Sequence, residues 1–309
     1  MSYKIGVDGG GTKTECILVD PAGRMIACHI GTGCNPSVVG PESAVSILNA
    51  ALSSLRAQAV THAAGTQGLP AREETLITDT LLCMAGSRGF WSEFAAKLTG
   101  FGRVVTGDDS LPILELATHG RPGLALHSGT GSFVTARAPD GSVHYAGGLG
   151  WRFGDPGSGY DLGQRAIARG LLEIQGWAPP SRLGPAVREH AQLDATADIN
   201  AITRYFYSQA DPTRHIAAFA PAVLRLAAGR DEPARQIVLE STGALLDLAV
   251  GVATKLFSAA KLGTVEAGLS GPILNHPLVV EAFAARSPFA LAPITETPIE
   301  GVRRLLMRS

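Results

Sequence analysis

The sequence predicts an α/β protein made of two similar halves, and three observations support this fold class. At 309 residues the chain is longer than a typical single domain, so two domains are expected. Short apolar runs alternate with segments of helical spacing over residues 1–110, which is typical of layered α/β folds. A second cycle with the same plan begins at Gly123, which indicates an internal duplication.

The first half begins with apolar runs of strand length that are separated by turn residues. Residues 21–23 (Pro-Ala-Gly) mark one turn, and "GTQGLPAREE" at 65–74 reads as a loop. Between them, apolar residues recur at helical spacing behind Pro41 and Glu42. The expected elements are strands over 4–8, 15–20 and 24–31, a helix over 45–55, a strand over 75–86, a helix over 90–98 and a strand over 103–107.

The second half repeats this opening and then becomes helical. Residues 123–148 read as strand, glycine-hydroxyl turn, strand, Pro-Asp-Gly turn and strand, in the same order as residues 5–27. From Asp161 to about Leu262 the apolar pattern is mostly helical. A final strand within 265–273 and a helix over 299–307 are expected to close the chain.

Composition and charge exclude several classes of function. A formal net charge of −1 with scattered Lys and Arg gives no basic surface for nucleic acid. Cys16, Cys28, Cys34 and Cys83 form no CxxC pair, which argues against a disulfide framework and against a zinc site. No apolar stretch reaches about 18 residues and no leader pattern precedes Asp8, so we expect no membrane segment and a cytoplasmic location.

The stretch "DGGGTKT" at 8–14 follows the first strand and fits neither of two well-known phosphate loops. Lys13 follows Thr12 directly, so the spacing of a Walker A loop is absent. Thr14 stands where a dinucleotide fingerprint needs its third glycine, and a strand follows instead of a helix. A plain hairpin turn remains possible. Three consecutive glycines cost more backbone entropy than a hairpin needs, which favours a turn that approaches an anion closely.

A second turn, "SGTGS" at 128–132, has the same character and also joins two predicted strands. Two turns of glycine and hydroxyl residues can bind one polyphosphate from two sides. The pair therefore favours a nucleotide-binding protein over two unrelated hairpins.

These motifs together resemble a known family. "DGGGTKT" at 8–14, "SGTGS" at 128–132 and "GGLGWRFGDPGSGYDLG" at 147–163 are similar to those of the N-acetylglucosamine kinase family. In its broad form this group is called the BadF/BadG/BcrA/BcrD-type ATPase family, and it lies within the actin, hexokinase and heat-shock ATPase superfamily. Further similar stretches are 33–40, 216–223 and 297–306.

The resemblance implies a fold and its domain limits. We expect two ribonuclease-H-like (actin-like ATPase) domains with an inter-domain cleft. The first comprises residues 1–111 plus 291–309, because the C-terminal helix returns to it. The second comprises residues 112–290 and carries a helical insertion.

The resemblance also implies ATP and Mg²⁺ as ligands and assigns roles to individual residues. Asp8 is expected near the metal. The expected phosphate-binding residues are Gly9, Gly10, Gly11, Thr12, Lys13 and Thr14 in the first turn, and Gly129, Thr130, Gly131 and Ser132 in the second. The expected adenosine-binding residues are Gly268, Ser270 and Gly271, and the expected sugar-binding residues are Asn35, Ser128, Gly148 and Asp155.

The catalytic base is expected after the strand at 103–107, where Asp108 and Asp109 stand side by side. Counting back from Gly123 without a gap places the family's aspartate on Asp109. One carboxylate that accepts the proton of a sugar hydroxyl is sufficient. The other aspartate is expected to cap the helix that begins near Leu111.

The predicted function is an ATP-dependent sugar kinase that acts on an amino sugar or an N-acetylhexosamine, with N-acetylglucosamine or glucosamine as first choice and a homodimer as the expected assembly. Pro156 replaces a family glutamate and Leu149 stands where tryptophan is common, so the acceptor sugar stays open. An activator-like ATPase with an iron–sulfur cluster is disfavoured, because the sequence has no cysteine after Cys83. A non-catalytic sugar or nucleotide sensor is the third alternative.

Overall fold

The computed structural model describes residues 2–67 and 76–308, which form two compact units. Unit 1 comprises Met1–His119 and Glu296–Ser309, and unit 2 comprises Gly120–Thr295. The domain limits expected from the sequence, 1–111 with 291–309 and 112–290, remain a proposal. Each unit is described by itself below.

Unit 1 is built on a five-stranded mixed sheet with the order β3-β2-β1-β4-β5. β1 pairs antiparallel with β2 and β2 with β3, whereas β1 pairs parallel with β4 and β4 with β5. The strands are β1 (Tyr3–Gly9), β2 (Lys13–Val19), β3 (Met25–Thr32), β4 (Ile77–Met84) and β5 (Arg103–Asp108). The helices are α1 (Pro36–Val39), α2 (Pro41–Gln67), α3 (Arg88–Lys97), α4 (Leu111–Thr118) and α12 (Pro298–Arg308).

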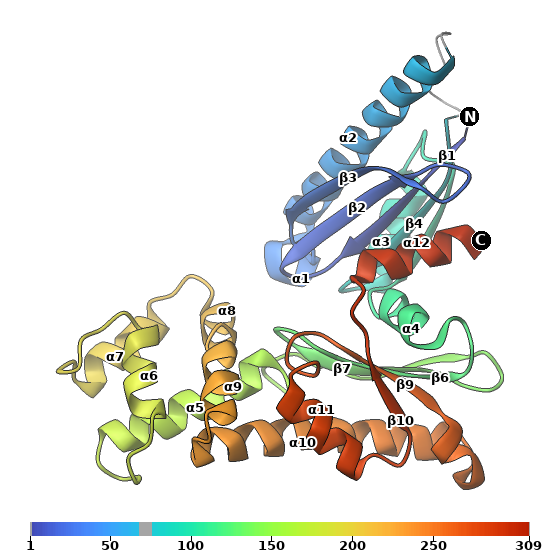
Figure 1. The fold of residues 1–309 in the computed structure, drawn as a ribbon. Coiled ribbons are helices and arrows are strands. Elements are labelled where there is room, and N and C mark those ends of the chain that lie inside the picture. Colours follow the sequence, from blue (N-terminus) through green and yellow to red (C-terminus); the bar gives the residue numbers. More distant parts are fainter. Residues whose placement is uncertain (1, 68–75, 309) are drawn as a thin grey trace. The chain divides into compact units, whose positions relative to one another are not determined.

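The two faces of this sheet are covered by different helices (Figure 1). Alternate residues of a strand point to opposite faces. Tyr3, Ile5 and Val7 of β1 are therefore buried in the cluster that includes residues of α2 and α3. On the other face, a Cβ at Gly6 would lie 2.6 Å from Val302 of α12, so glycine lets this helix pack directly on β1. Asp8 continues the α12 face at the carboxyl end of β1.

Unit 2 repeats the sheet topology of unit 1. Its five-stranded sheet has the order β10-β9-β6-β7-β8, which is the order of unit 1 read from the opposite edge. β6, β7 and β8 form the antiparallel meander, and β6, β9 and β10 are parallel. The strands are β6 (Gly123–Ser128), β7 (Ser132–Arg137), β8 (Val143–Gly147), β9 (Glu266–Ser270) and β10 (Ala290–Pro293).

Helices follow β8 in unit 2 and supply most of its core. Their bounds are α5 (Gly159–Ile174), α6 (Leu183–His190), α7 (Ile199–Tyr207), α8 (Pro212–Ala217), α9 (Ala220–Ala228), α10 (Glu232–Leu256), the short 3-10 helix η2 (Ala259–Thr264) and α11 (Pro277–Arg286). α10 runs along the sheet of unit 2 (Figure 1). α10 is long and apolar enough to cross a membrane, but 44% of its most apolar 18-residue stretch is buried inside the protein. Leu245, Leu246 and Ala249 belong to the core cluster, so α10 has the packing of a core helix.

The topology confirms the predicted α/β class with two ribonuclease-H-like halves, because both sheets share one strand order. The predicted helix over 45–55 was too short. Ala59 and Ala63 continue the buried face of Leu55 at four-residue spacing, so α2 extends to Gln67. The predicted loop at 65–74 was therefore wrong over 65–67, and the rest of it lies outside the described residues. β10 was missed, since four residues give too little alternation to detect.

The C-terminal helix α12 is held on unit 1 by an ion pair between a half-exposed arginine and a buried carboxylate. Glu115 of α4 is fully buried, and both of its carboxylate oxygens lie within 2.9 Å of the Arg308 guanidinium. Arg308 also donates to the His119 carbonyl over 2.9 Å. The charge of Glu115 thus depends on a helix that is 193 residues away in sequence.

Replacing Arg308 with Ala should destabilise the protein by about 2 kcal/mol, because it leaves the Glu115 carboxylate buried without its partner. This figure is below that for a fully buried pair, since the Arg308 side chain is 49% exposed. Denaturant unfolding would measure the change. Arg121→Ala, which breaks an exposed pair with Glu266 in unit 2, is the matched control and should cost less than about 0.5 kcal/mol. Equal losses in the two variants would contradict the role of the pair between Arg308 and Glu115.

Candidate functional site

The first predicted phosphate turn is the tight connection between β1 and β2. The Gly10 amide donates to the Lys13 carbonyl over 2.9 Å and closes the turn. The Cys34 amide donates to the Gly10 carbonyl and the Gly33 amide to the Thr12 carbonyl, both over 3.1 Å. The turn carbonyls thus bond within the protein. In the described chain, the amides of Gly11 and Thr12 donate no backbone hydrogen bond.

The three glycines of this turn are not equally explained by packing. A Cβ at Gly9 would lie 2.5 Å from the end of the Met84 side chain and 3.0 Å from Cys34 Sγ, so packing within unit 1 favours glycine there. A Cβ at Gly11 would contact only Val38, at 3.9 Å. None of the three glycines has a positive φ. The fold therefore leaves room for a side chain at Gly11, and close approach to a ligand is a separate reason for glycine.

The hydroxyls of the first turn differ in their surroundings. Thr12 is exposed at the tip of the turn. Thr14 is fully buried on the α2 face, and its Oγ1 makes no hydrogen bond of ordinary geometry. Thr12 is therefore accessible to a phosphate, whereas Thr14 lies inside unit 1.

Asp8 lies at the carboxyl end of β1, in a row with Cys83 of β4 and Gly107 of β5. Burial raises the pKa of Asp8 to about 7, with Lys13 opposing and Glu15 adding to the rise. Burial also raises the pKa of the Cys83 thiol, and the charges of Asp8 and Asp109 add to that effect. These side chains therefore share the α12 face of the sheet edge.

Asp108 and Asp109 occupy different environments although they are neighbours. Asp108 Oδ2 accepts from Arg88 Nη2 over 3.0 Å, and its Oδ1 accepts from the Ser110 amide over 3.1 Å. Burial acts to raise the pKa of Asp108, but the hydrogen bonds from Ser110 and Arg88 outweigh it and hold the pKa below its ordinary value. Asp108 thus serves the start of α4 and binds α3.

Asp109 follows the end of β5 and forms no ion pair with a cationic side chain of the described residues. Burial raises its pKa to about 7, and the charges of Asp108 and Asp8 add to the rise. A carboxyl group with this pKa can both accept and release a proton near neutral pH. Of the two candidates, Asp109 has the environment of a base.

Glu15 is a residue of this site that the motif reasoning missed. It pairs in register with Asp8 across β1 and β2, and it is only 9% exposed. Lys13 Nζ contacts Glu15 Oε2 at 2.5 Å. Sequence alone offered one signal, which is an acidic residue in the otherwise apolar run of β2.

Asn35 lies beside the first turn and caps a short helix. Its Oδ1 accepts from the Ser37 amide over 3.0 Å at the start of α1. A Cβ at Gly86 would lie 2.8 Å from the same oxygen, which places Asn35 next to the end of β4. The cap engages the amide oxygen and leaves the NH₂ group of Asn35 as a donor.

The second predicted phosphate turn joins β6 to β7 in unit 2 and rests on the start of α5. The Gly159 amide donates to the Gly129 carbonyl over 2.8 Å, and the Tyr160 amide donates to the Thr130 carbonyl over 3.2 Å. Thr130 is exposed at the tip. As in unit 1, the turn carbonyls bond within the protein.

The two serines that flank this turn have structural partners. Ser128 is fully buried and its Oγ donates to the Gly157 carbonyl over 2.5 Å. Ser132 is 2% exposed and its Oγ donates to the Pro156 carbonyl over 2.8 Å. Both hydroxyls therefore bind the segment that leads into α5 and are not free to meet a ligand in this conformation.

Asp155 lies against the second turn. A Cβ at Gly131 would be 3.1 Å from Asp155 Oδ2, and Asp155 Oδ1 accepts from the Gly150 amide over 3.2 Å. Burial raises the pKa of Asp155, the Gly150 hydrogen bond opposes the rise, and Asp161 adds to it. Gly148 belongs to the same glycine-rich segment, where its φ is +61° and a Cβ would lie 2.1 Å from the Tyr145 hydroxyl. Unit 2 thus gathers Gly131, Asp155 and this segment.

The predicted adenosine turn lies next to the second phosphate turn. Gly271 has φ +96°, and a Cβ there would lie 2.0 Å from the Ser128 carbonyl oxygen, so only glycine fits. Gly268 is buried inside β9, and Ser270 Oγ is 3.1 Å from His127 Nδ1. Burial lowers the pKa of His127 to about 4, so the imidazole is neutral at pH 7. The Ser270 hydroxyl thus ties β9 to β6.

The donor set at Asp8 fits Mg²⁺ bound mainly by water and phosphate. Mg²⁺ prefers oxygen ligands and is commonly held by one or two carboxylates together with substrate phosphates. Across residues 2–67 and 76–308 no three His, Cys, Asp or Glu side chains converge on one point. Asp8 fits the carboxylate role, because its buried charge would be offset by a cation.

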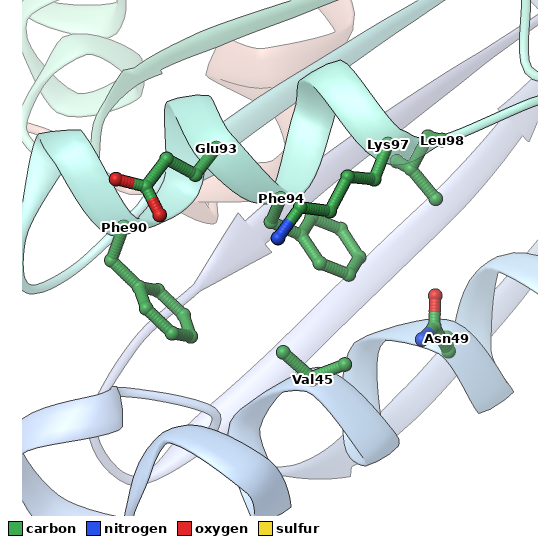
Figure 2. A pocket seen from close by; sticks show the side chains of 7 residues that line it. All are labelled: Val45, Asn49, Phe90, Glu93, Phe94, Lys97 and Leu98. Carbon is green, nitrogen blue, oxygen red and sulfur yellow. The ribbon is translucent and has the colours of Figure 1, made fainter.

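A cavity of about 280 Å³ lies elsewhere in unit 1, between α2 and α3. Figure 2 shows Phe90, Phe94 and Lys97 of α3 and Val45 of α2 around it. The remaining lining residues are Asn49, Glu93 and Leu98. None of the predicted site residues lines this cavity, so it is separate from the carboxylates at the sheet edge.

Replacing Asp109 with Asn should stabilise the ligand-free protein increasingly as the pH rises. The folded-state pKa of about 7 lies above the ordinary 3.8, so the stability that protonated Asp109 contributes is complete below pH 3.8 and lost as the pH rises through 7. Between pH 5 and pH 8 the advantage of the Asn variant should grow by about 1–2 kcal/mol, which is less than the full shift because Asp109 is partly exposed. Denaturant unfolding at both pH values measures this.

Asp108→Asn is the matched control with the opposite sign. The pKa of Asp108 is held below 3.8, so the ionised group contributes stability at neutral pH that is lost as the pH falls through the folded pKa. Its Asn variant should be less stable than the wild type at pH 8. If both variants responded to pH alike, the assignment of distinct environments would be wrong.

Comparison with known proteins gives one family and consistent relatives. The chain is 26% identical to an N-acetyl-D-glucosamine kinase of Dictyostelium discoideum, over 82% of this chain and 79% of the relative. It is 23% identical to an N-acetylmuramic acid/N-acetylglucosamine kinase of Clostridium acetobutylicum, over 92% and 89%. A solved structure from Chromobacterium violaceum, provisionally named an N-acetylglucosamine kinase, has 27% identity and a TM-score of 0.77 over 99% of both chains.

The family model for the BadF/BadG/BcrA/BcrD ATPases matches residues 5–302, which include both glycine turns, Asp8, Asp109 and Asp155. A match over nearly the whole chain confirms the resemblance that the motifs indicated. The chain belongs to the BadF/BadG/BcrA/BcrD ATPase family.

Proposed function

We propose that this protein is an ATP-dependent sugar kinase whose acceptor is an amino sugar or an N-acetylhexosamine, with N-acetylglucosamine or glucosamine as first choice. The names of the relatives support a sugar kinase, and the family supports ATP as the donor. The observation that carries the proposal is Asp109, a carboxyl group with a pKa of about 7 on the same sheet edge as Asp8. We further propose a cytoplasmic homodimer.

Phosphoryl transfer requires positioning and charge neutralisation more than covalent chemistry. In unit 1, the amides of Gly11 and Thr12 and the Thr12 hydroxyl would bind phosphate oxygens. In unit 2, the turn at 129–131 would do the same. Gly271 would lie against the adenosine, whereas Gly268 is left out of this set because it is buried inside β9.

Asp109 would act as the general base. It would accept the proton of the attacking sugar hydroxyl and so increase the nucleophilicity of that oxygen. A base works best when its pKa lies near the operating pH, and a pKa of about 7 meets this condition. Asp108, held by Arg88 and Ser110, would keep the start of α4 in place.

Asp8 would hold Mg²⁺ on the phosphate side of unit 1. When bound, Mg²⁺ neutralises developing charge on the transferred phosphoryl group. The Asn35 NH₂ group, Asp155 and the backbone at Gly148 would recognise the sugar. We leave Ser128 out of this set, because its hydroxyl donates to the Gly157 carbonyl.

Two alternatives make different demands on the same chain. An activator-like ATPase would need thiolates for its cluster beside the second turn, where Leu126 and His127 stand instead. A non-catalytic sensor would bind nucleotide without turnover. An ATP-consumption assay over amino sugars, neutral hexoses and a no-sugar control separates them: turnover that depends on a sugar supports the kinase, and turnover without a sugar supports a bare ATPase.

Asp109→Asn should lower kcat with the preferred sugar by about 1000-fold and leave the affinity for MgADP nearly unchanged, because only proton acceptance is removed. Asp108→Asn should lower kcat by less than about 10-fold, since it loses only a positioning contact. Steady-state kinetics and calorimetric MgADP binding measure both effects. A dead Asp108 variant beside an active Asp109 variant would move the base by one residue.

Gly11→Ala should abolish detectable MgADP binding and leave the unfolding midpoint close to that of the wild type. Its Cβ has room in the ligand-free fold, with 3.9 Å to Val38, but would occupy the space of a phosphate oxygen. Gly251→Ala on the exposed face of α10 is the control, because it also adds a methyl group into open space. Unchanged nucleotide affinity in Gly11→Ala would argue against phosphate binding at this turn.

A further inference from the structure

Glu15 is a nearly buried carboxylate beside the first glycine turn, and the roles proposed above do not use it. Its side chain is 11% exposed, and within the described chain it forms an ion pair with Lys13, whose Nζ is 2.5 Å from Oε2. A buried charge without a partner is costly. Glu15 therefore needs the Lys13 ammonium group.

The Lys13 side chain, in contrast, is 47% exposed and would be free to move in water without a partner. A lysine at the tip of a hairpin samples many rotamers in water, and fixing it in one of them costs free energy. The contact with Glu15 holds the ammonium group in one place beside β2. The Lys13 side chain is thus already ordered before a phosphate binds, so binding does not have to supply the free energy for ordering it.

The strand register places this pair next to Asp8. Asp8 and Glu15 are register partners on β1 and β2, so their side chains leave the same face of the sheet. The ammonium of Lys13 acts on both carboxylates: it lowers the pKa of Asp8, whereas Glu15 raises it. A cation held here acts electrostatically on the residue proposed for Mg²⁺, and it belongs to the residue whose carbonyl closes the turn proposed for phosphate.

We propose that Glu15 is a positioning residue for nucleotide binding, which holds Lys13 Nζ at the first glycine turn, where it meets the phosphates of ATP. The inference rests on the proposed binding of ATP phosphates by this turn. Glu15 itself touches no ligand in this role and acts only through Lys13. Its negative charge is accepted at the site because the pair, taken together, is neutral.

The alternative is a pair with a purely structural role, and another pair of the same sheet offers the comparison. Asp79 at the start of β4 binds Arg103 of β5 over 3.1 Å, with side-chain exposures of 21% and 62%. These residues lie at the opposite end of the strands from Asp8. Asp79→Asn therefore removes a carboxylate from the same sheet without touching either turn.

The test is a double-mutant cycle on the full chain, read by calorimetric binding of MgADP. Glu15→Gln should weaken binding by about 5–10-fold, and Lys13→Met by at least as much. The double variant should bind no more weakly than Lys13→Met does, because Glu15 contributes to binding only through the lysine. Glu15→Asp, which keeps the charge on a shorter stem, should restore part of the loss. Asp79→Asn should bind as the wild type does.

Three outcomes would overturn the role of Glu15: wild-type affinity in Glu15→Gln, losses that multiply in the double variant, or tighter binding once the negative charge is removed. Thermal unfolding of each variant separates a loss of fold from a loss of affinity. If Glu15→Gln does not fold, Glu15→Asp decides, because it keeps the charge but draws the carboxylate back from Lys13 Nζ: weaker binding supports the role, and wild-type affinity contradicts it. A wild type that binds no MgADP would refute the proposed function instead, whereas a binding wild type with an unaffected Glu15→Gln refutes only this inference.

Discussion

The parallel pairing of β1 with β4 and of β4 with β5 is the constraint on which the candidate site in unit 1 depends. Parallel strands bring their carboxyl ends to one edge of the sheet. Asp8, Cys83 and Gly107 form one row across these strands, and Asp109 stands two residues after Gly107. Residues about 100 positions apart in sequence thus share one partly buried environment. Burial raises the pKa values of both Asp8 and Asp109.

The end of β5 separates the environments of two neighbouring aspartates. β5 ends at Asp108, and Asp109 belongs to the turn that leads to α4. Asp108 meets Arg88 from α3, and the charge of Asp109 acts on the Asp8 side. A single-residue step therefore separates an ionised structural carboxylate from one that titrates near neutral pH. Neither property belongs to aspartate as a residue type; both come from the burial, hydrogen bonds and neighbouring charges of each carboxylate.

Much of the fold and of the candidate site could be predicted from the sequence, because glycine turns and strand periodicity are local signals. The strands at 4–8 and 15–20, the duplicated plan and the family followed from them. The partners of Ser128 and Ser132 did not, because a hydroxyl in a glycine turn looks the same whether it faces a ligand or the Gly157 carbonyl. Glu15 was missed for a similar reason, since its importance depends on the register of β2 against β1.

The packing of α12 has a consequence for how unit 1 is completed during synthesis. One face of its sheet, which includes Ile17 and Val19, is covered by residues of the last helix. When residues 1–119 leave the ribosome, this apolar face and the carboxylate of Glu115 have no cover, and 176 residues of unit 2 must follow first. Unit 2 is continuous in sequence and can assemble as soon as it emerges. Unit 1 therefore begins to be synthesised first but is completed last. Until α12 packs on it, the uncovered apolar face of its sheet can bind chaperones or aggregate.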